Sequence, residues 1–316
     1  MINQVSFPGL GLDFTLNRVA FEILGRPIYW YGIIIVSGLL LAVWLCGRWG
    51  GRFGITEEQI LDMMMFAVPA ALVAIRAYYV VFHLDLFRQE DGSLDWSAVL
   101  RYSDGGLAIY GAIISSAIVL LVFCRWKKIS FLAFADLGVH GLFVGQMIGR
   151  WGNFMNVEAY GGVTGLPWRM CSESIANELW GKGLVTTQAE YQAILDGTLG
   201  VHPTFFYESL WNFVGLLAVY QIGKRLRRFD GQCFLFYVFW YGLGRAWIEG
   251  LRTDSLYLYV GSSIRVSQLV AVVSALLAAA AFAVLWRRKH NPEELYVNKL
   301  AARQTGDVLG GEAEEE

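Results

Sequence analysis

The sequence of 316 residues has little charge: Asp, Glu, Lys and Arg make up only 16% of it, against about 25% in soluble domains. Hydrophobic residues account for 56%, and the mean hydropathy is +0.45. So little charge cannot cover a water-facing surface of this size, and intrinsic disorder over most of the chain is excluded because it requires low hydrophobicity. The net charge of -2 excludes nucleic-acid binding through bulk positive charge. We therefore expect an all-α integral membrane protein with no nucleic-acid partner.

Cysteine and metal-ligand patterns are also scarce. Cys46, Cys124 and Cys233 lie at the ends of apolar runs, and Cys171 lies alone in a long polar segment. The sequence has no CxxC pair and no Cys/His metal spacing, so we expect four thiols outside any disulfide. It has no Asp-rich cluster of the kind that holds Mg²⁺ on a phosphate, and no HxxxxD acyltransferase pattern. These absences predict a protein without a metal or other cofactor.

Long apolar stretches are what the sequence does contain. A helix needs about 20 mostly apolar residues to cross a bilayer, and seven stretches qualify or nearly qualify. They cover residues 28–46, 60–83, 107–124, 131–148, 204–222, 233–250 and 264–286. The second follows the letters TEEQ, a pattern typical of a helix start. The sequence therefore predicts seven membrane-spanning helices.

Basic residues orient these spans. Arg48 and Arg52 follow the first span, RWKK follows the third, GKRLRRF follows the fifth and RRK follows the seventh. The positive-inside rule then places the N-terminus outside and the C-terminus in the cytoplasm, as an odd number of spans requires. We expect an outer N-terminal arm over 1–27, a body over 28–290 with an outward-facing head at 151–202, and a disordered acidic cytoplasmic tail over 291–316.

Polar side chains gather at one level in this arrangement, the outer ends of the spans. Ionisable groups inside a membrane are costly and usually functional. Five spans contribute to the set, which comprises Arg76, Tyr110, Arg150, Asn153, Asn156, Glu158, His202, Tyr207, Glu208, Tyr241, Arg245, Glu249 and Arg252. Spacings of four, four and three place the last four on one helix face. By contrast, we interpret Asp136, in the inner half of its span, as a structural partner of a neighbouring helix.

Several arginines facing an outer-leaflet cavity indicate an anionic phospholipid head group, because the planar guanidinium binds phosphate bidentately. Structural alternatives remain at this point. Arg245 and Glu249 could only lock helices together, Glu158 could anchor a loop, and His202 could cap a helix. Arg76 could extend to the interface by snorkelling, and Arg252 could be a topology or lipid contact.

Three classes of function fit these residues: a lipid-modifying enzyme, a transporter or flippase for an anionic lipid, and a receptor-like or scaffold protein. The one-sided placement of the polar groups favours the enzyme. The lack of an evident internal repeat disfavours the transporter folds that are built from repeats.

The segment GRWGNFMNVEAYG, from Gly149 to Gly161, resembles the signature of the prolipoprotein diacylglyceryl transferase family, G-R-x-G-N-F-x-N-x-E-x-x-G. Four further segments follow the family order: WYG at 30–32, DGG at 104–106, HPTFFYE at 202–208 and YGLGRAWIEGLR at 241–252. The resemblance covers about residues 25 to 288.

This resemblance implies an enzyme of the bacterial cell (cytoplasmic) membrane that carries out the first step of lipoprotein maturation. Such a transferase moves the diacylglyceryl group of phosphatidylglycerol onto the lipobox cysteine thiol of a preprolipoprotein and releases glycerol phosphate. The implied partners are phosphatidylglycerol, preprolipoprotein signal peptides with a lipobox Cys, and membrane lipids. The implied active site faces the outer leaflet.

The resemblance also assigns residues. Arg150 and Arg245 correspond to the family's essential arginines, and Tyr31 matches a tyrosine near the site. The other matching positions are Asn153, Glu158, Gly161, Tyr241 and Glu249. One position departs from the family: many members carry His-Gly-Gly after the DGG run, whereas this chain reads DGGLAIYGA, with Tyr110 in place of the His. Tyrosine is a weaker base than histidine at neutral pH and a good hydrogen-bond donor.

The expected chemistry is attack of a thiolate on the glycerol carbon that bears the phosphate. We expect Arg150 and Arg245 to stabilise the charge that grows on the leaving phosphate, with Tyr110 and Glu249 as further catalytic groups. The thiol proton has Glu249, Glu208 or His202 as candidate acceptors, or needs none if arginine stabilises the thiolate. The expected substrate-binding residues are Arg150, Asn153, Asn156, Glu158, Gly161, Tyr31, Arg76, His202, Glu208, Tyr241 and Arg252.

Overall fold

The computed structural model describes residues 2–89, 91–102, 105–106, 108–253 and 265–312, and most of them are helical. The chain divides into two compact units. The first comprises residues 1–45 and 136–292, and the second comprises 46–135 and 293–316.

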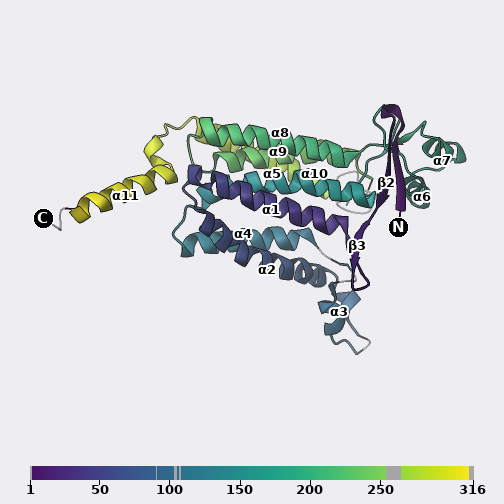
Figure 1. Ribbon diagram of the computed structural model, residues 1–316, viewed down its shortest axis with the longest axis horizontal. Helices are drawn as coiled ribbons and strands as arrows, with labels where there is room; N and C mark the ends of the chain where they lie inside the picture. The colour runs from purple at the N-terminus through teal and green to yellow at the C-terminus, as the bar shows by residue number, and fades with distance from the viewer. Residues whose placement is uncertain (1, 90, 103–104, 107, 254–264, 313–316) are drawn as a thin grey trace. The chain divides into compact units, whose positions relative to one another are not determined.

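Seven long helices lie where the apolar stretches predicted them (Figure 1). They are α1 (Trp30–Gly50), α2 (Glu57–Phe82), α4 (Ile109–Trp126), α5 (Phe131–Asn156), α8 (Thr204–Gln221), α9 (Gln232–Leu251) and α10 (Val266–Trp286). A π-helical turn, η5 (Ile222–Leu226), ends α8. The expected first residues of two spans, Leu107 and Ile264, lie outside the described residues.

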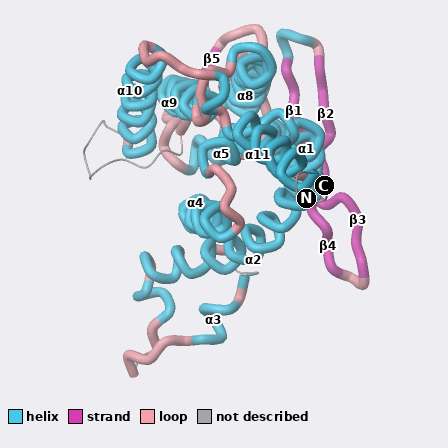
Figure 2. Tube along the Cα trace, turned by 90° about the vertical axis from the view of Figure 1, so that its left-hand side faces the viewer, coloured by secondary structure: helices cyan, strands magenta, loops and turns pink. Residues whose placement is uncertain are grey.

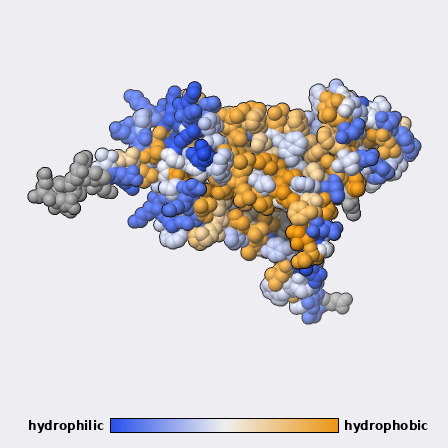
Figure 3. Space-filling view, viewed as in Figure 1, coloured by the Kyte–Doolittle hydropathy of each residue, from blue (hydrophilic) through white to orange (hydrophobic). Residues whose placement is uncertain are grey.

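Within the described ranges, five helices are long and apolar enough to cross a membrane: α1 with the turn after it, α2, α4, α5 and α10. Their sides expose large apolar residues such as Leu40, Val73, Ile118 and Leu276, and Figure 3 shows hydrophobic side chains over the long helices. The other two expected spans, α8 and α9, are helical but less apolar, because they carry the buried polar residues that form the site described below.

Hydrogen bonds between side chains and backbone amides stabilise the starts of α2 and α9. Thr56 caps α2: its hydroxyl accepts from the Gln59 amide at 3.2 Å, while the Gln59 side chain accepts from the Thr56 amide at 3.0 Å. Asp136, fully buried in α5, accepts hydrogen bonds from the amides of Gly231 and Phe234 at 2.8 Å each, at the start of α9. Asp136 is therefore a structural partner of a neighbouring helix, as the sequence indicated.

A pair of tryptophans holds α8 against α9. The indole N–H of Trp211 donates to the Trp240 carbonyl and that of Trp240 donates to the Trp211 carbonyl, both at 2.9 Å. Their rings stack with centroids 4.4 Å apart. A Cβ at Gly244 would lie 2.2 Å from the Trp211 indole nitrogen, so only glycine leaves room for the pair. This contact fixes how Glu208 on α8 faces Arg245 on α9.

The N-terminal segment, expected only as an outer arm, forms two antiparallel hairpins, so the fold is not purely helical (Figure 2). Strand β1 (Ile2–Phe7) pairs with β2 (Leu12–Asn17), and β3 (Val19–Ile23) pairs with β4 (Arg26–Tyr29). A short 3₁₀ turn, η1 (Pro8–Leu10), closes the first hairpin. The alternating residues Val5 and Phe7 bury one face of β1, and this period of two favours a strand.

That face packs into the core of the segment between α5 and α8, which we call the head (residues 157–203). The head contains β5 (Val163–Thr164), α6 (Glu173–Gly181), α7 (Gln188–Leu195) and β6 (Gly200–Val201). Its core holds Ile175, Leu179 and Ile194 together with residues of β1 and β2. Helix α5 extends into the signature, to Asn156, and inserts Phe154 into this core.

In the second unit, α2 packs along α4, and the segment between them includes η3 (Leu84–Phe87) and α3 (Trp96–Leu100). The turn η2 (Gly51–Phe53) follows α1. The turn η6 (Pro292–Glu294) precedes the tail, and the boundary between the two units falls after its first residue. The tail was predicted to be disordered, but Tyr296–Glu312 form α11. Val297 and Leu300 of α11 contact the turn at Gly54. This packing supports the helix, and the acidic residues at the end of the sequence gave no indication of it.

Candidate functional site

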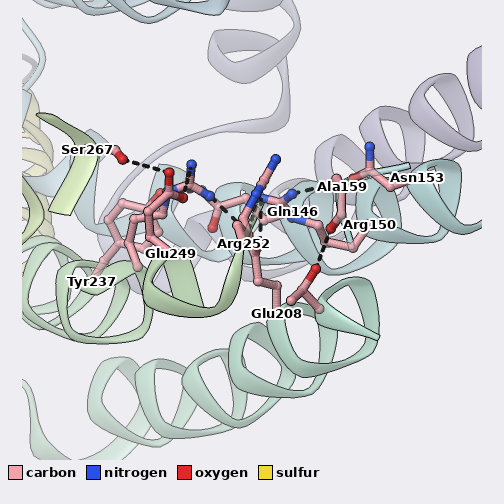
Figure 4. A network of polar contacts seen from close by, with 11 residues as sticks. Gln146, Arg150, Asn153, Ala159, Glu208, Tyr237, Glu249, Arg252 and Ser267 are labelled. Atoms are coloured by element: carbon pink, nitrogen blue, oxygen red, sulfur yellow. Dashed lines mark hydrogen bonds and ion pairs between the residues drawn. The ribbon is translucent and has the colours of Figure 1, made fainter. Parts of the chain in front are cut away.

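A buried carboxylate, Glu208 of α8, lies among three arginines in the first unit (Figure 4). Its side chain is only 6% exposed and forms an ion pair with Arg150 of α5. The nearest nitrogens of Arg245, in the C-terminal half of α9, and of Arg252, directly after α9, lie 3.7 Å from the other carboxylate oxygen. Three helices thus converge on one acidic side chain.

Glu249 adds a second carboxylate one turn after Arg245. Arg245 Nη2 lies 2.6 Å from Glu249 Oε2, and Glu249 is 3% exposed. Ser267 Oγ of α10 donates to Glu249 Oε1 at 2.8 Å. Sequence reasoning missed Ser267, although the polar pair Ser-Gln at the start of the otherwise apolar α10 was a usable signal.

These five residues form what we call the arginine cluster: Arg150, Glu208, Arg245, Glu249 and Arg252. Three guanidinium groups face two carboxylates, so the ionised cluster carries one positive charge in excess. The side chains of Arg150 and Arg245 are about one-fifth exposed, at 21% and 20%. The cluster can therefore present donors to an anionic group without exposing its carboxylates.

The polar end of α5 extends the cluster. Arg150 Nη1 donates to Asn153 Oδ1 at 3.4 Å, and Asn153 Nδ2 donates to Glu158 Oε1 at 2.9 Å. Asn156 Nδ2 donates to the same oxygen at 3.2 Å. Val157, with φ of 52°, turns the chain in the left-handed region and returns Glu158 towards the two amides. Glu158 therefore anchors the asparagines, which is one of its two sequence interpretations.

Gly161 closes the signature by backbone contacts rather than through a side chain. Its amide donates to the His202 carbonyl at 2.9 Å, and the next amide, of Gly162, donates to the Leu251 carbonyl at 2.7 Å. A Cβ at Gly161 would lie 2.7 Å from His202 Cβ and 2.9 Å from the Leu251 carbonyl oxygen. The glycine thus allows the start of α8 and the end of α9 to meet across the head.

His202 lies at this junction, beside two aromatic side chains. Its Nδ1 is 3.3 Å from the Tyr207 hydroxyl, and that hydroxyl accepts a hydrogen bond from the Trp168 indole at 2.6 Å. The residue that caps α8 is Pro203, so His202 does not act as a side-chain cap. Burial lowers the pKa of His202, which favours the neutral imidazole, the form able to accept a proton.

Two of the predicted site residues in this unit are tyrosines, Tyr31 and Tyr241. A Cβ at Gly152 of the signature would lie 2.8 Å from the Tyr31 ring, so glycine at this position leaves room for the ring. The Tyr241 ring stacks on Tyr237 at 5.6 Å, and the Tyr237 hydroxyl accepts from Gln146 at 2.7 Å. A mostly apolar cavity of about 840 Å³ beside α1 and β4 borders Tyr31 and Asn156.

The structure thus brings together, within the first unit, all but two of the predicted site residues. The two exceptions, Arg76 and Tyr110, belong to the second unit. Arg76 is 5% exposed, and its guanidinium donates to backbone carbonyls of residues 98, 99, 105 and 106. Tyr110 is half exposed in the first turn of α4, with its ring centroid 6.3 Å from that of Tyr78. Asp104 of the DGG run lies outside the described residues.

The cysteines lie apart from this chemistry. All four are buried, and none of them forms a disulfide. Burial raises the pKa of the Cys171 thiol in the head to about 11, and its Sγ donates to the Leu199 carbonyl at 3.1 Å. In the part of the chain that the structure describes, no three His, Cys, Asp or Glu side chains are grouped as metal ligands.

The chain is similar to known proteins over most of its length. Residues 18–285 match the family model described as "Prolipoprotein diacylglyceryl transferase". A relative from Limosilactobacillus reuteri is 40% identical over 303 residues, which are 95% of this chain and 99% of the relative. One from Enterococcus faecalis is 39% identical over 285 residues (90% and 95%), and one from Bacillus cytotoxicus is 37% identical over 294 residues (92% and 99%).

Each of these three relatives is named "Phosphatidylglycerol--prolipoprotein diacylglyceryl transferase". The matched region contains the signature from Gly149 to Gly161 and the segments of α8 and α9 that build the arginine cluster. The similarity confirms the resemblance that the signature indicated. The chain belongs to the prolipoprotein diacylglyceryl transferase family.

Proposed function

We propose that this protein transfers the diacylglyceryl group of phosphatidylglycerol to the lipobox cysteine thiol of preprolipoproteins, the first step of lipoprotein maturation. Family membership supports the reaction. The observation that carries it is the arginine cluster, in which three guanidinium groups outnumber two carboxylates. Guanidinium is the side chain best suited to a phosphate, because two parallel N–H donors match two oxygens.

In this reaction the thiolate sulfur attacks the glycerol carbon that bears the phosphate, and a C–S bond forms as the C–O bond breaks. The bonding electron pair leaves with the phosphate oxygen, so glycerol phosphate departs as the anion. Arg150 and Arg245 donate to the phosphate oxygens and stabilise the charge that grows there. Glu208 and Glu249 hold the guanidinium groups in place before the lipid binds.

The thiol proton must move to an acceptor. Glu208 and Glu249 are each engaged by arginines, whereas His202 lies outside these ion pairs, and burial lowers its pKa. The backbone links His202 to the cluster, because Gly161 donates to the His202 carbonyl and forms a bridge with Arg252. Asn153, Asn156, Glu158, Tyr31 and Tyr241 border the lipid and peptide in this proposal.

The membrane arrangement that accompanies this function has seven spans, with α8 and α9 added to the five most apolar helices. Pairing among Glu208, Arg245 and Glu249 supports burial of their charges in the membrane. Basic residues after α1, α4, η5 and α10 support an outer N-terminus and a cytoplasmic C-terminus. The head and the arginine cluster then face the outer leaflet of a bacterial cell membrane.

The test is mass spectrometry of a lipobox peptide incubated with purified protein and phosphatidylglycerol in detergent. We expect a mass increase of one diacylglyceryl group on the cysteine, with release of glycerol phosphate. A peptide with serine in place of that cysteine is the matched control, because it lacks the thiol. Detergent also removes the two compartments that a transporter requires. No adduct from folded protein would contradict the proposal and favour a transporter of anionic lipid.

A further inference from the structure

Arg76 was predicted to bind substrate, but its guanidinium is occupied by the protein's own backbone. Nε donates to the Val99 carbonyl and Nη2 to the Ala98 carbonyl, both at 2.8 Å. Nη1 donates to the carbonyls of Gly105 at 2.6 Å and Gly106 at 3.0 Å. A guanidinium has five N–H donors, so these four contacts leave little capacity for a phosphate.

The contacts join two ends of one connecting segment. Ala98 and Val99 lie in the last turn of α3, and the Ala98 carbonyl also accepts from the Arg101 amide at 3.2 Å. Gly105 and Gly106 lie shortly before α4 and belong to the DGG run. The planar fork of one buried arginine thus ties the end of α3 to the approach to α4.

The backbone conformation of Gly106 and its lack of a side chain permit this arrangement. Its φ is 68°, in the region that favours glycine. A Cβ there would lie 2.6 Å from the Tyr79 ring and 2.8 Å from Arg76 Nη1. A side chain at this position would therefore displace the guanidinium from its carbonyls.

Shortly after Gly106, backbone contacts hold the start of α4 against α2. The Ala108 amide donates to the carbonyl of Ile75, the residue before Arg76, at 3.2 Å. A Cβ at Gly111 would lie 2.1 Å from the Ala74 carbonyl oxygen, so the two backbones are in close contact. Tyr110 lies between these two contacts, in the first turn of α4.

We infer that Arg76 is a positioning residue, which holds the Gly105–Gly106 turn and through it sets the place of Tyr110, and that it does not bind the lipid phosphate. The inference rests on the proposed function, because Tyr110 matters only if the transfer takes place. The part that concerns the turn itself can be tested without activity.

The experiment compares Arg76→Lys, Gly106→Ala and Tyr110→Phe in purified full-length protein. The kinetic readout is kcat and KM for phosphatidylglycerol in the lipobox-peptide assay. The structural readout is amide hydrogen exchange in peptides covering α3 and the start of α4. Two controls match the changes: Arg101→Lys alters an exposed arginine beside α3, and Gly92→Ala alters a glycine with φ of 82° and no atom within 4 Å of the new Cβ.

We expect Arg76→Lys and Gly106→Ala to lower kcat by about 100-fold, the scale of a misplaced catalytic group, with KM for the lipid unchanged. Both should speed exchange in the two peptides, whereas the controls should change neither readout. In the Tyr110→Phe background, Arg76→Lys should cause no further loss of kcat. A raised KM with kcat retained, a full additional loss in that background, or unchanged exchange would overturn the inference. If the wild-type protein makes no adduct, the proposed function fails, and exchange alone decides whether Arg76 holds the turn.

Discussion

Glu208 of α8 and Arg150 of α5 form an ion pair, and the same carboxylate has Arg245 and Arg252 on its other side at 3.7 Å. A carboxylate among three guanidinium groups brings them closer together than their mutual repulsion would otherwise allow. The pair therefore accounts for how three guanidinium groups can lie close together inside the protein.

Replacing Arg150 tests the anion-binding role. Arg150→Ala should lower transfer by at least about 100-fold, because a donor to the developing phosphate charge is lost. Arg150→Lys should restore little, because ammonium lacks the bidentate fork. The readout is adduct formation by mass spectrometry, with the protein shown to be folded in detergent. Arg26→Ala, in the exposed β3–β4 hairpin, is the control. Normal transfer by Arg150→Ala would contradict the assignment.

Removing the central carboxylate should act on stability as well as activity. Glu208→Gln leaves three guanidinium groups without their shared negative partner, and breaking a buried ion pair costs about 3–5 kcal/mol. Unfolding followed by circular dichroism in detergent should show this loss. Glu178→Gln removes one partner of an exposed pair on α6 with Lys182 and should change stability by less than about 1 kcal/mol. Equal effects of the two substitutions would contradict the central role of Glu208.

Gly161→Ala should separate the start of α8 from the end of α9. The new Cβ would lie 2.7 Å from His202 Cβ, and overpacking of this kind costs about 1–3 kcal/mol. We expect lower thermal stability and reduced transfer. Gly165→Ala, where the nearest atom would be 3.9 Å away, is the matched control. If Gly161→Ala is as stable and active as Gly165→Ala, the junction is not under this constraint.

The lowered pKa of His202 predicts a pH dependence of stability. As pH falls below about 6.5, the reference value for histidine, the unfolded chain binds the proton before the folded protein does. The free energy of unfolding should therefore decrease on acidification and level off below the folded pKa of His202. His202→Gln should flatten this slope, because it removes the imidazole with the lowered pKa. An unchanged slope in His202→Gln would show that another group titrates.

Much of the fold was readable because it depends on local pattern. The apolar stretches predicted seven long helices, and the cap at Thr56 was visible as TEEQ. The hairpins of the N-terminal segment and the helix α11 were not predicted. Their formation depends on packing partners far along the chain, such as Cys171, whose backbone exchanges two hydrogen bonds with that of Ser6.

The site divides in the same way. The candidate site residues were predicted from the polar positions near helix ends and from the signature, and all but two of them lie in the first unit. Ser267 was missed, and Arg76 was given a substrate role, because neither residue's partners can be deduced from its neighbours in sequence. Arg76 instead donates to backbone carbonyls more than twenty residues away, which no side-chain pattern records.

The sequence by itself determined the membrane character, the position of the long helices and the family of this protein. Hydrophobicity, helix period and signature spacing are local properties, so they can be read from the sequence alone. Only the tertiary structure decided that Glu208 serves three arginines, that Gly161 joins two helix ends through its backbone, and that Arg76 holds a turn. Those outcomes depend on how each helix is rotated and packed, which is set by contacts such as the Trp211–Trp240 pair between residues distant in the chain.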